Sequence, residues 1–280
     1  MDIYAEVTNR IIAELEKDCI PWRKPWRSLG AAVSHATGRP YSLLNQMLVG
    51  APGEYYTFKQ VVEAGGHVRK GEKAKIIVLW KWLDGKDEDG NEKKIPFLKY
   101  FNVFNSTQCE GLVNKYYKPN EKPADPDANA EQIIADYLSR ETVTISHVEG
   151  NQAFYRPSTD QIVLPMMSQF SETAEYYSTA FHEMVHSTGH ASRLNRLSDD
   201  SRFGNEVYSK EELIAEIGGA ALVFQAGLET ESSFRNSTAY IRSWLKALKD
   251  DKRLIISAAG RADDATNYIL HGKQTAEAAA

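Results

Sequence analysis

Phe181-His182-Glu183-Met184-Val185-His186-Ser187-Thr188-Gly189-His190 is the stretch of this sequence that decides the fold around it. It contains an HExxH motif, in which two histidines stand four positions apart. Residues at this spacing lie on one face of a helix, so His182 and His186 can both offer an imidazole nitrogen to one metal ion. Glu183, beside them, has the chemistry of a general base. The motif therefore predicts a catalytic zinc site on a helix.

The residues around the motif support a helix that follows a hairpin. Ser171 and the acids after it are typical of a helix N-terminus, and Gly189 is typical of a residue that ends a helix. Upstream, the apolar stretches 154–156 and 162–164 are separated by a Pro-Ser-Thr-Asp turn, which predicts a β-hairpin. A strand followed by a helix with metal-binding histidines is typical of zincin metallopeptidases. The alternative, two surface histidines beside an acid, does not account for these neighbours.

The overall composition is that of a globular protein. The chain has 280 residues, 42% hydrophobic and 25% charged, which is enough for two domains. We expect no membrane span and no export signal, because no apolar run is long enough for either. Its two cysteines, Cys19 and Cys109, form neither a disulfide framework nor a metal pattern. These features predict a cytoplasmic protein with free thiols.

Charge divides the chain into two unlike halves. Residues 1–122 hold 19 Lys and Arg against 15 Asp and Glu, a net charge of +4, which leaves −9 for the rest of a chain whose total is −5. The stretch 118–129 is rich in Pro, Asp, Glu and Asn, as linkers are. We expect one domain over 1–122, a linker over 123–129 and a metal-binding domain over 130–280. Only the basic half is expected to face a polyanion.

The N-terminal half interleaves aromatic and basic side chains. Such a surface is typical of proteins that bind single-stranded DNA without sequence preference, since bases stack on the rings while the cations neutralise phosphates. The candidate DNA-binding residues are Trp22, Arg23, Lys24, Trp26, Arg39 and Tyr41, then Arg69, Lys70, Lys73 and Lys75 in a basic turn, then Trp80 and Trp82 in the strand that follows. The alternative is that the rings are core anchors and the cations only solvate the surface near them.

The third metal ligand is expected on a later helix. A catalytic zinc usually has three protein ligands and a water, and Ser192 stands where one common pattern would place a third histidine. Ser209 to Glu212 match a capping box, in which the Glu212 side chain turns back to the backbone. We therefore expect Glu216, one turn further on, to bind the metal and Glu212 to orient an imidazole, with the reverse assignment left open.

The chemistry expected of this site is hydrolysis of an amide. With Zn²⁺ on the two histidines and Glu216, Glu183 would accept the proton of the attacking water. His190 and Tyr208 are candidates for the group that stabilises the oxyanion. Another divalent metal such as Mn²⁺ is an alternative to zinc.

Several motifs occur in order along the chain. They are Thr37-Gly38-Arg39-Pro40-Tyr41, Lys70-Gly71-Glu72-Lys73, Val103-Phe104-Asn105, Gln108-Cys109-Glu110-Gly111, the HExxH stretch, and Glu211-Glu212-Leu213-Ile214-Ala215-Glu216. Together they resemble the plasmid antirestriction proteins of the ArdC type, and the resemblance extends over nearly the whole chain.

This resemblance implies an α+β protein of two domains, an N-terminal single-stranded-DNA-binding domain and a C-terminal zincin-like metallopeptidase domain. Proteins of this type are carried on conjugative plasmids and protect incoming DNA from host restriction, and relatives of the N-terminal domain are fused to plasmid primases. The implied partners are single-stranded DNA and a host restriction component or another DNA-bound protein. Two hypotheses follow: an enzyme that cleaves such a protein, or a DNA-coating protein whose metal domain is structural or serves for docking.

Overall fold

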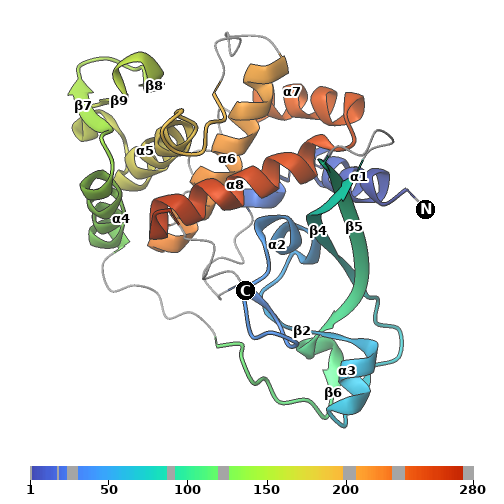
Figure 1. Cartoon of the computed structure of the whole chain (residues 1–280). Coiled ribbons are helices and arrows are strands. Elements are labelled where there is room, and N and C mark those ends of the chain that lie inside the picture. Colours follow the sequence, from blue (N-terminus) through green and yellow to red (C-terminus); the bar gives the residue numbers. More distant parts are fainter. Residues whose placement is uncertain are drawn as a thin grey trace.

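The computed structural model describes residues 2–17, 19–23, 31–86, 92–118, 126–197, 206–228 and 237–273. Within these ranges, the side chains of 23, 80–86, 92–96, 126, 206–209 and 237–243 are not described. A helical region and a sheet region lie on either side of helix α8 (Leu254–His271), which crosses the centre of the molecule (Figure 1). None of the helices in the described ranges is both long and apolar enough to cross a bilayer.

The N-terminal part forms a mixed four-stranded sheet with small helices around it. Its elements are α1 (Ile3–Leu15), β1 (Ala32–Ser34), α2 (Leu43–Val49), β2 (Gly53–Thr57), α3 (Phe58–Glu63), β3 (His67–Val68), β4 (Lys75–Lys86), β5 (Glu92–Asn105) and β6 (Cys109–Glu110). The strand order is β1-β2-β5-β4, and β1 alone pairs in parallel. The long β4–β5 pair confirms the strand expected after the basic turn, where β-branched and aromatic residues are frequent.

A buried glutamate fixes the end of this part of the chain. Glu54 on β2 is fully buried and accepts hydrogen bonds of 2.8 to 3.1 Å from the backbone N–H groups of residues 115–117. Burial by itself would raise the pKa of Glu54, but its hydrogen bonds with His35, with this backbone and with the Tyr56 hydroxyl lower it to about 2. The charged carboxylate therefore holds residues 115–117 against the sheet.

The C-terminal part is a small sheet packed against helices. Its elements are α4 (Pro126–Arg140), β7 (Thr144–Val148), β8 (Phe154–Arg156), β9 (Gln161–Pro165), α5 (Thr173–Thr188), α6 (Glu206–Ala226), α7 (Ser237–Asp250) and α8. The strand order is β7-β9-β8, with β7 parallel and β8 antiparallel to β9. The expected hairpin before the metal helix is confirmed.

Two features of the structure bear on the junction of the halves. Residues 126–129 of the expected linker form the first turn of α4, because a proline is well suited to that position. In addition, α1 packs on α7 and α8, so the first helix shares one hydrophobic core with the C-terminal helices. The Thr8 hydroxyl donates a 2.7 Å hydrogen bond to the carbonyl of Lys252 across this contact. The domain boundary at 122 stays a prediction.

Candidate metal centre

Two helices in close contact build the site. α5 carries the HExxH motif, with Tyr177, Phe181 and Val185 buried in the core. α6 crosses it at Gly219, where an added Cβ would lie 3.2 Å from both the backbone N and the Cα of His182. A side chain there would push the helices apart, so Gly219 permits the close approach of α5 and α6.

The ends of α5 differ from the sequence expectation. Its N-cap is Glu172 rather than Ser171, and no side chain caps it. Gly189 does end the helix, but with a φ of −74° rather than a left-handed conformation. The requirement for glycine is steric, since a Cβ there would lie 2.8 Å from Cγ of Leu197. The chain after α5 can therefore fold back tightly over the helix end.

The donor atoms of the site fit a metal ion. The Nε2 atoms of His182 and His186 lie 3.1 Å apart. The Glu212 carboxylate lies 3.6 Å from Nε2 of His182 and 3.3 Å from Nε2 of His186. Ligand atoms about 2.1 Å from a tetrahedral ion lie about 3.4 Å from one another. Two imidazoles and one carboxylate at this spacing are the donor set of a catalytic divalent metal site.

In this geometry Glu212, rather than the expected Glu216, is the carboxylate that clusters with the two Nε2 atoms. Glu216 lies 3.9 Å from Nδ1 of His182, the ring nitrogen that faces away from the shared centre, so it can orient that imidazole. The physical reason is the start of the helix. α6 begins at Glu206, so Ser209 lies inside the helix instead of capping it, and the Glu212 side chain points to the histidines.

A further carboxylate, missed by the sequence analysis, supports His186. Glu211 lies 3.6 Å from Nδ1 of His186 and is itself fixed by a 2.9 Å ion pair with Arg196. Arg196 also donates to the carbonyl of Val185 at the end of the metal helix. The only sequence signal was the paired acids at the start of the Glu-Glu-Leu-Ile-Ala-Glu motif, both of which face the metal helix.

The charges around the imidazoles favour a cation. Burial would lower the pKa of His182 and His186, but their hydrogen bonds with Glu212, and with Glu211 for His186, raise both values above normal. The buried carboxylate of Glu183 adds to this effect. A metal ion must displace protons from the two rings, so we infer that metal binding weakens as the pH falls.

The two oxyanion candidates are not brought to this centre by any described contact. His190 lies just past α5, where its Nδ1 is 2.8 Å from the Ser192 hydroxyl. The side chain of Tyr208 lies outside the described part of the structure.

A buried arginine holds the metal helix against the neighbouring sheet. Arg193 is 6% exposed and donates a 2.7 Å hydrogen bond to the carbonyl of Ser187 on α5. It also pairs with Asp160, which precedes β9, and donates to the Tyr155 hydroxyl on β8. The chain after α5 is therefore tied to both the helix and the hairpin.

We expect Arg193→Met to lower the free energy of unfolding by about 3–5 kcal/mol, because the change leaves the mostly buried Asp160 carboxylate without its charged partner. Denaturant titration measures this value. The control is Arg156→Met, an exposed arginine stacked on Phe154, which should cost less than about 1 kcal/mol. Equal small losses in the two variants would show that the Arg193 network does not hold the site together.

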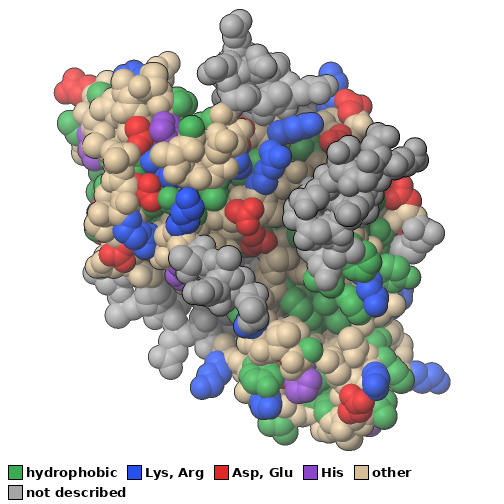
Figure 2. Space-filling view, viewed as in Figure 1, with side chains coloured by type: hydrophobic (Ala, Val, Ile, Leu, Met, Phe, Trp, Pro, Cys, Tyr) green, Lys and Arg blue, Asp and Glu red, His purple; other side chains and the backbone are tan. Residues whose placement is uncertain are grey.

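A groove of about 950 Å³ runs between the N-terminal sheet and α8. Arg39, Tyr41, Leu79 and Phe101 line it on one side, and Arg261 lines it from α8. Leu79 is 44% exposed, an unusual position for a large apolar side chain. Figure 2 shows the hollow below the helices, with hydrophobic side chains gathered beside it over β4 and β5.

The described DNA-binding candidates do not all line the groove. Arg39 and Tyr41 line the groove, whereas Trp22 is 5% exposed and packs edge-on against Trp244 at 5.2 Å, so Trp22 is a core anchor and not an exposed platform. The four cations of the basic turn are exposed, and none of them is among the described residues that line the groove. They are Arg69, Lys70, Lys73 and Lys75. The side chains of the other candidates lie outside the described ranges: Arg23, Lys24, Trp26, Trp80 and Trp82.

Comparison with known proteins places both regions in families. Residues 1–104 match the family model of the N-terminal domain of anti-restriction factor ArdC, and residues 128–261 match that of a zincin-like metallopeptidase. A metal-free crystal structure of the antirestriction ArdC protein from R388 plasmid is 37% identical, with a TM-score of 0.75 over 98% of this chain and 100% of that one. The chain belongs to the ArdC family of antirestriction proteins. The two-domain α+β fold expected from the sequence is thereby confirmed.

Other relatives of this ArdC-family protein differ in length and metal content. A Mn(II)-bound structure of the R388 protein is also 37% identical, with a TM-score of 0.77 over 97% of this chain and 98% of that one, which supports a divalent metal site here. The uncharacterized protein y4eC of Sinorhizobium fredii is 32% identical over 98% of this chain and 93% of its own length. Two DNA primases TraC of Escherichia coli are 34% and 35% identical over 96% and 97% of this chain, but the chain spans only 20% and 27% of them.

Proposed function

We propose that this ArdC-family protein binds single-stranded DNA in the groove beside α8 and hydrolyses a protein at the metal centre, protecting incoming plasmid DNA from host restriction. The observation that carries the proposal is the buried Glu183 next to a donor set of two histidines and Glu212. A purely structural metal site needs no additional carboxylate at this position, whereas a hydrolase needs a general base. The protein substrate proposed is a restriction component or another protein bound to the DNA.

The residues of the centre divide the work of hydrolysis. His182, His186 and Glu212 would hold Zn²⁺ or Mn²⁺, and the bound ion supplies a Lewis acid that polarises a carbonyl and makes its water acidic. Glu183 would accept the proton of that water and deliver it to the leaving amine. Glu216 and Glu211 orient the two imidazoles from behind, since each faces an Nδ1 atom.

The groove has the features that a single strand requires. Arg39 and Arg261 can neutralise phosphates from opposite walls, and the ring of Phe101 offers a face for base stacking. Asp263 and Asp264 also line the groove, and burial raises the pKa of Asp263 to about 7, so the repulsion between Asp263 and phosphate weakens below that pH. The strand would therefore lie along the sheet with its backbone toward the arginines.

We expect the double variant Arg39→Gln/Arg261→Gln to bind an oligonucleotide more weakly and with a smaller salt dependence. Each lost phosphate contact should reduce the slope of log K against log salt by about 0.7, so the pair should reduce it by about 1.4. The control is Lys59→Gln/Lys246→Gln, which removes the same charge from exposed positions outside the groove. An unchanged slope in the groove variant would exclude this path for the DNA.

The basic turn is a second proposed phosphate contact, and Lys70→Gln/Lys73→Gln tests it by the same titration.

We also propose that the protein works in the cytoplasm, where the free thiols Cys19 and Cys109 would stay reduced.

A further inference from the structure

The turn between β1 and α2 supports an aromatic ring that is not among the DNA-binding candidates above. Gly38 in this turn has a φ of +68°, and a Cβ added to it would lie 2.8, 3.0 and 3.1 Å from Cδ1, Cε1 and Cγ of Tyr116. Nearly equal distances to three neighbouring ring atoms place Gly38 against the face of the ring rather than its edge. A side chain at this position would displace the ring, so the turn requires glycine.

The ring of Tyr116 is exposed, although one of its faces packs on Gly38. Tyr116 is 39% exposed, whereas the two tyrosines of β2, Tyr55 and Tyr56, are buried. Nζ of Lys115 lies 4.8 Å from the centre of the Tyr116 ring, within the distance of a cation–π contact. Because Lys115 is itself exposed and its side chain is long, its ammonium group can stay beside the ring while a ligand stacks there.

A buried carboxylate holds the backbone of Tyr116 in place. The N–H of Tyr116 donates a 2.8 Å hydrogen bond to Glu54, which is fully buried. The same carboxylate lies 2.5 Å from Nδ1 of His35, whose ring centre is 6.0 Å from that of Tyr116. A ring that is already fixed loses little conformational freedom when a ligand stacks on it, so these contacts favour binding.

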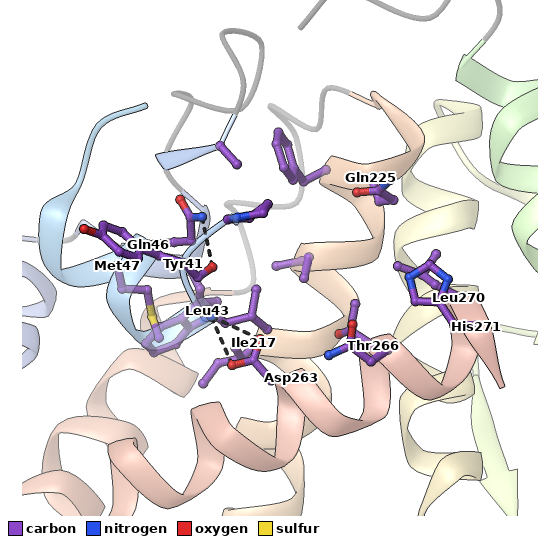
Figure 3. A pocket seen from close by; sticks show the side chains of 17 residues that line it. Tyr41, Leu43, Gln46, Met47, Ile217, Gln225, Asp263, Thr266, Leu270 and His271 are labelled. Carbon is purple, nitrogen blue, oxygen red and sulfur yellow. Dashed lines mark hydrogen bonds between the residues drawn. The ribbon is translucent and has the colours of Figure 1, made fainter. Parts of the chain in front are cut away.

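The turn under the ring is also fixed at its base. The side-chain amide of Gln46 on α2 donates to the carbonyls of Ala32 and Tyr41, both at 3.0 Å, and accepts a 2.9 Å hydrogen bond from the N–H of Ala32. Figure 3 shows Gln46 beside Tyr41, where the two residues line a pocket next to α6 and α8. The residues between Ala32 and Tyr41 are therefore held as one unit against α2.

This turn separates the ring from the DNA groove by the thickness of one chain segment. Thr37 and Arg39 line the groove, and Gly38, which supports Tyr116, stands between them. A single strand that leaves the groove past Arg39 and crosses the turn therefore meets the Tyr116 ring.

We propose that Tyr116 is a stacking platform for one base of the bound single strand where the strand leaves the groove, and that Lys115 and Lys118 contact the phosphates beside that base. This inference rests on the proposed function. The segment 114–118 holds two tyrosines and two lysines but no acid, and both lysines are exposed. An exposed ring next to cations is the combination that proteins use to bind single strands without sequence preference.

The groove itself contains a second ring with the same arrangement. Nζ of Lys99 lies 5.1 Å from the centre of the Phe101 ring, and Phe101 lines the groove. The two ring–lysine pairs lie on the two sides of the turn that carries Arg39. They would give the strand one stacking contact within the groove and one beyond it.

The first test is Tyr116→Leu in the full chain, with a fluorescently labelled oligonucleotide titrated at several salt concentrations. Leucine keeps an apolar side chain over Gly38 but offers no aromatic face, so affinity should fall about fivefold or more. The slope of log K against log salt should not change, because the ring carries no charge. Tyr116→Phe keeps the ring and should recover most of the affinity.

The matched control is Tyr100→Leu, which removes a ring of similar exposure, 44%, that does not line the groove. Its affinity should equal that of the wild type. Unchanged affinity in Tyr116→Leu would overturn the platform, and so would a loss in Tyr116→Phe as large as that in Tyr116→Leu, since the ring would then have no role.

The two lysines are tested by Lys115→Gln/Lys118→Gln in the same titration. If both contact phosphates, the slope of log K against log salt should fall by about 1.4. An unchanged slope would overturn their part of the proposal.

Photocrosslinking tests the platform in the wild-type protein, where no substitution can disturb the fold. An oligonucleotide that contains 5-iodouracil is irradiated in the complex, and the crosslinked peptides are identified by mass spectrometry after digestion. We expect a crosslink at Tyr116. Crosslinks confined to peptides outside residues 114–118 would contradict the proposal.

Failure of this inference and failure of the proposed function give different results. Wild-type protein that binds no single-stranded DNA would overturn both. Binding that depends on Arg39 and Arg261, with wild-type affinity in Tyr116→Leu and no crosslink at Tyr116, would overturn the stacking platform alone.

Discussion

Glu212→Gln should weaken the binding of Mn²⁺ or Zn²⁺ by a larger factor than the loss of a carboxylate that only orients a metal ligand. The loss of such an orienting carboxylate weakens metal binding by about 10–100-fold. Its carboxylate is within 3.6 Å of Nε2 of both histidines, so the change removes the charged ligand of the site. Glutamine keeps the size of the side chain and offers only a neutral oxygen. Calorimetric titration of metal into metal-free protein measures the affinity.

The matched control is Glu216→Gln, one helical turn away. Glu216 lies 3.9 Å from Nδ1 of His182 rather than near the shared Nε2 atoms, so its loss should stay within the range of about 10–100-fold. A larger loss in Glu216→Gln than in Glu212→Gln would restore the ligand expected from the sequence and contradict the geometry described above.

The sequence predicts the local part of this site, whereas the third ligand depends on a distant helix. The two histidines and Glu183 lie within one helix, where spacing alone fixes the geometry. The choice between Glu212 and Glu216 depended on where α6 begins, and helix starts are the least predictable feature of a sequence. A shift of the first turn converted an expected capping residue into the carboxylate that faces both imidazoles.

The groove and the shared core could not have been predicted from local pattern. Arg39 and Arg261 face one groove although they are far apart in the chain, and the packing of α2 on both β4 and α8 brings them together. The burial of Trp22 has the same origin, because its ring packs against Trp244 from α7. In the sequence, interleaved aromatic and basic residues form the same pattern whether the rings face the core or the solvent.

Glu183→Gln should keep the bound metal, and its rate of hydrolysis should fall by about 10²–10⁴-fold if the carboxylate is the general base. Glu183 is 6% exposed and its charge acts on both imidazoles, although it is not one of the three clustered donors. The amide of glutamine has similar size but cannot accept the proton of the attacking water. Glu175→Gln, about two turns earlier on α5, is the matched control and should leave hydrolysis unchanged.

The measurement that tests the account most directly is plasmid transfer into restricting and non-restricting recipients with the wild-type protein, Glu183→Gln or Glu175→Gln, with metal content determined on each purified protein. We predict one bound divalent metal in all three, protection by the wild type and Glu175→Gln, and loss of protection by Glu183→Gln. Full protection by a metal-loaded Glu183→Gln protein would contradict the catalytic role of the centre and leave it as a structural or docking element.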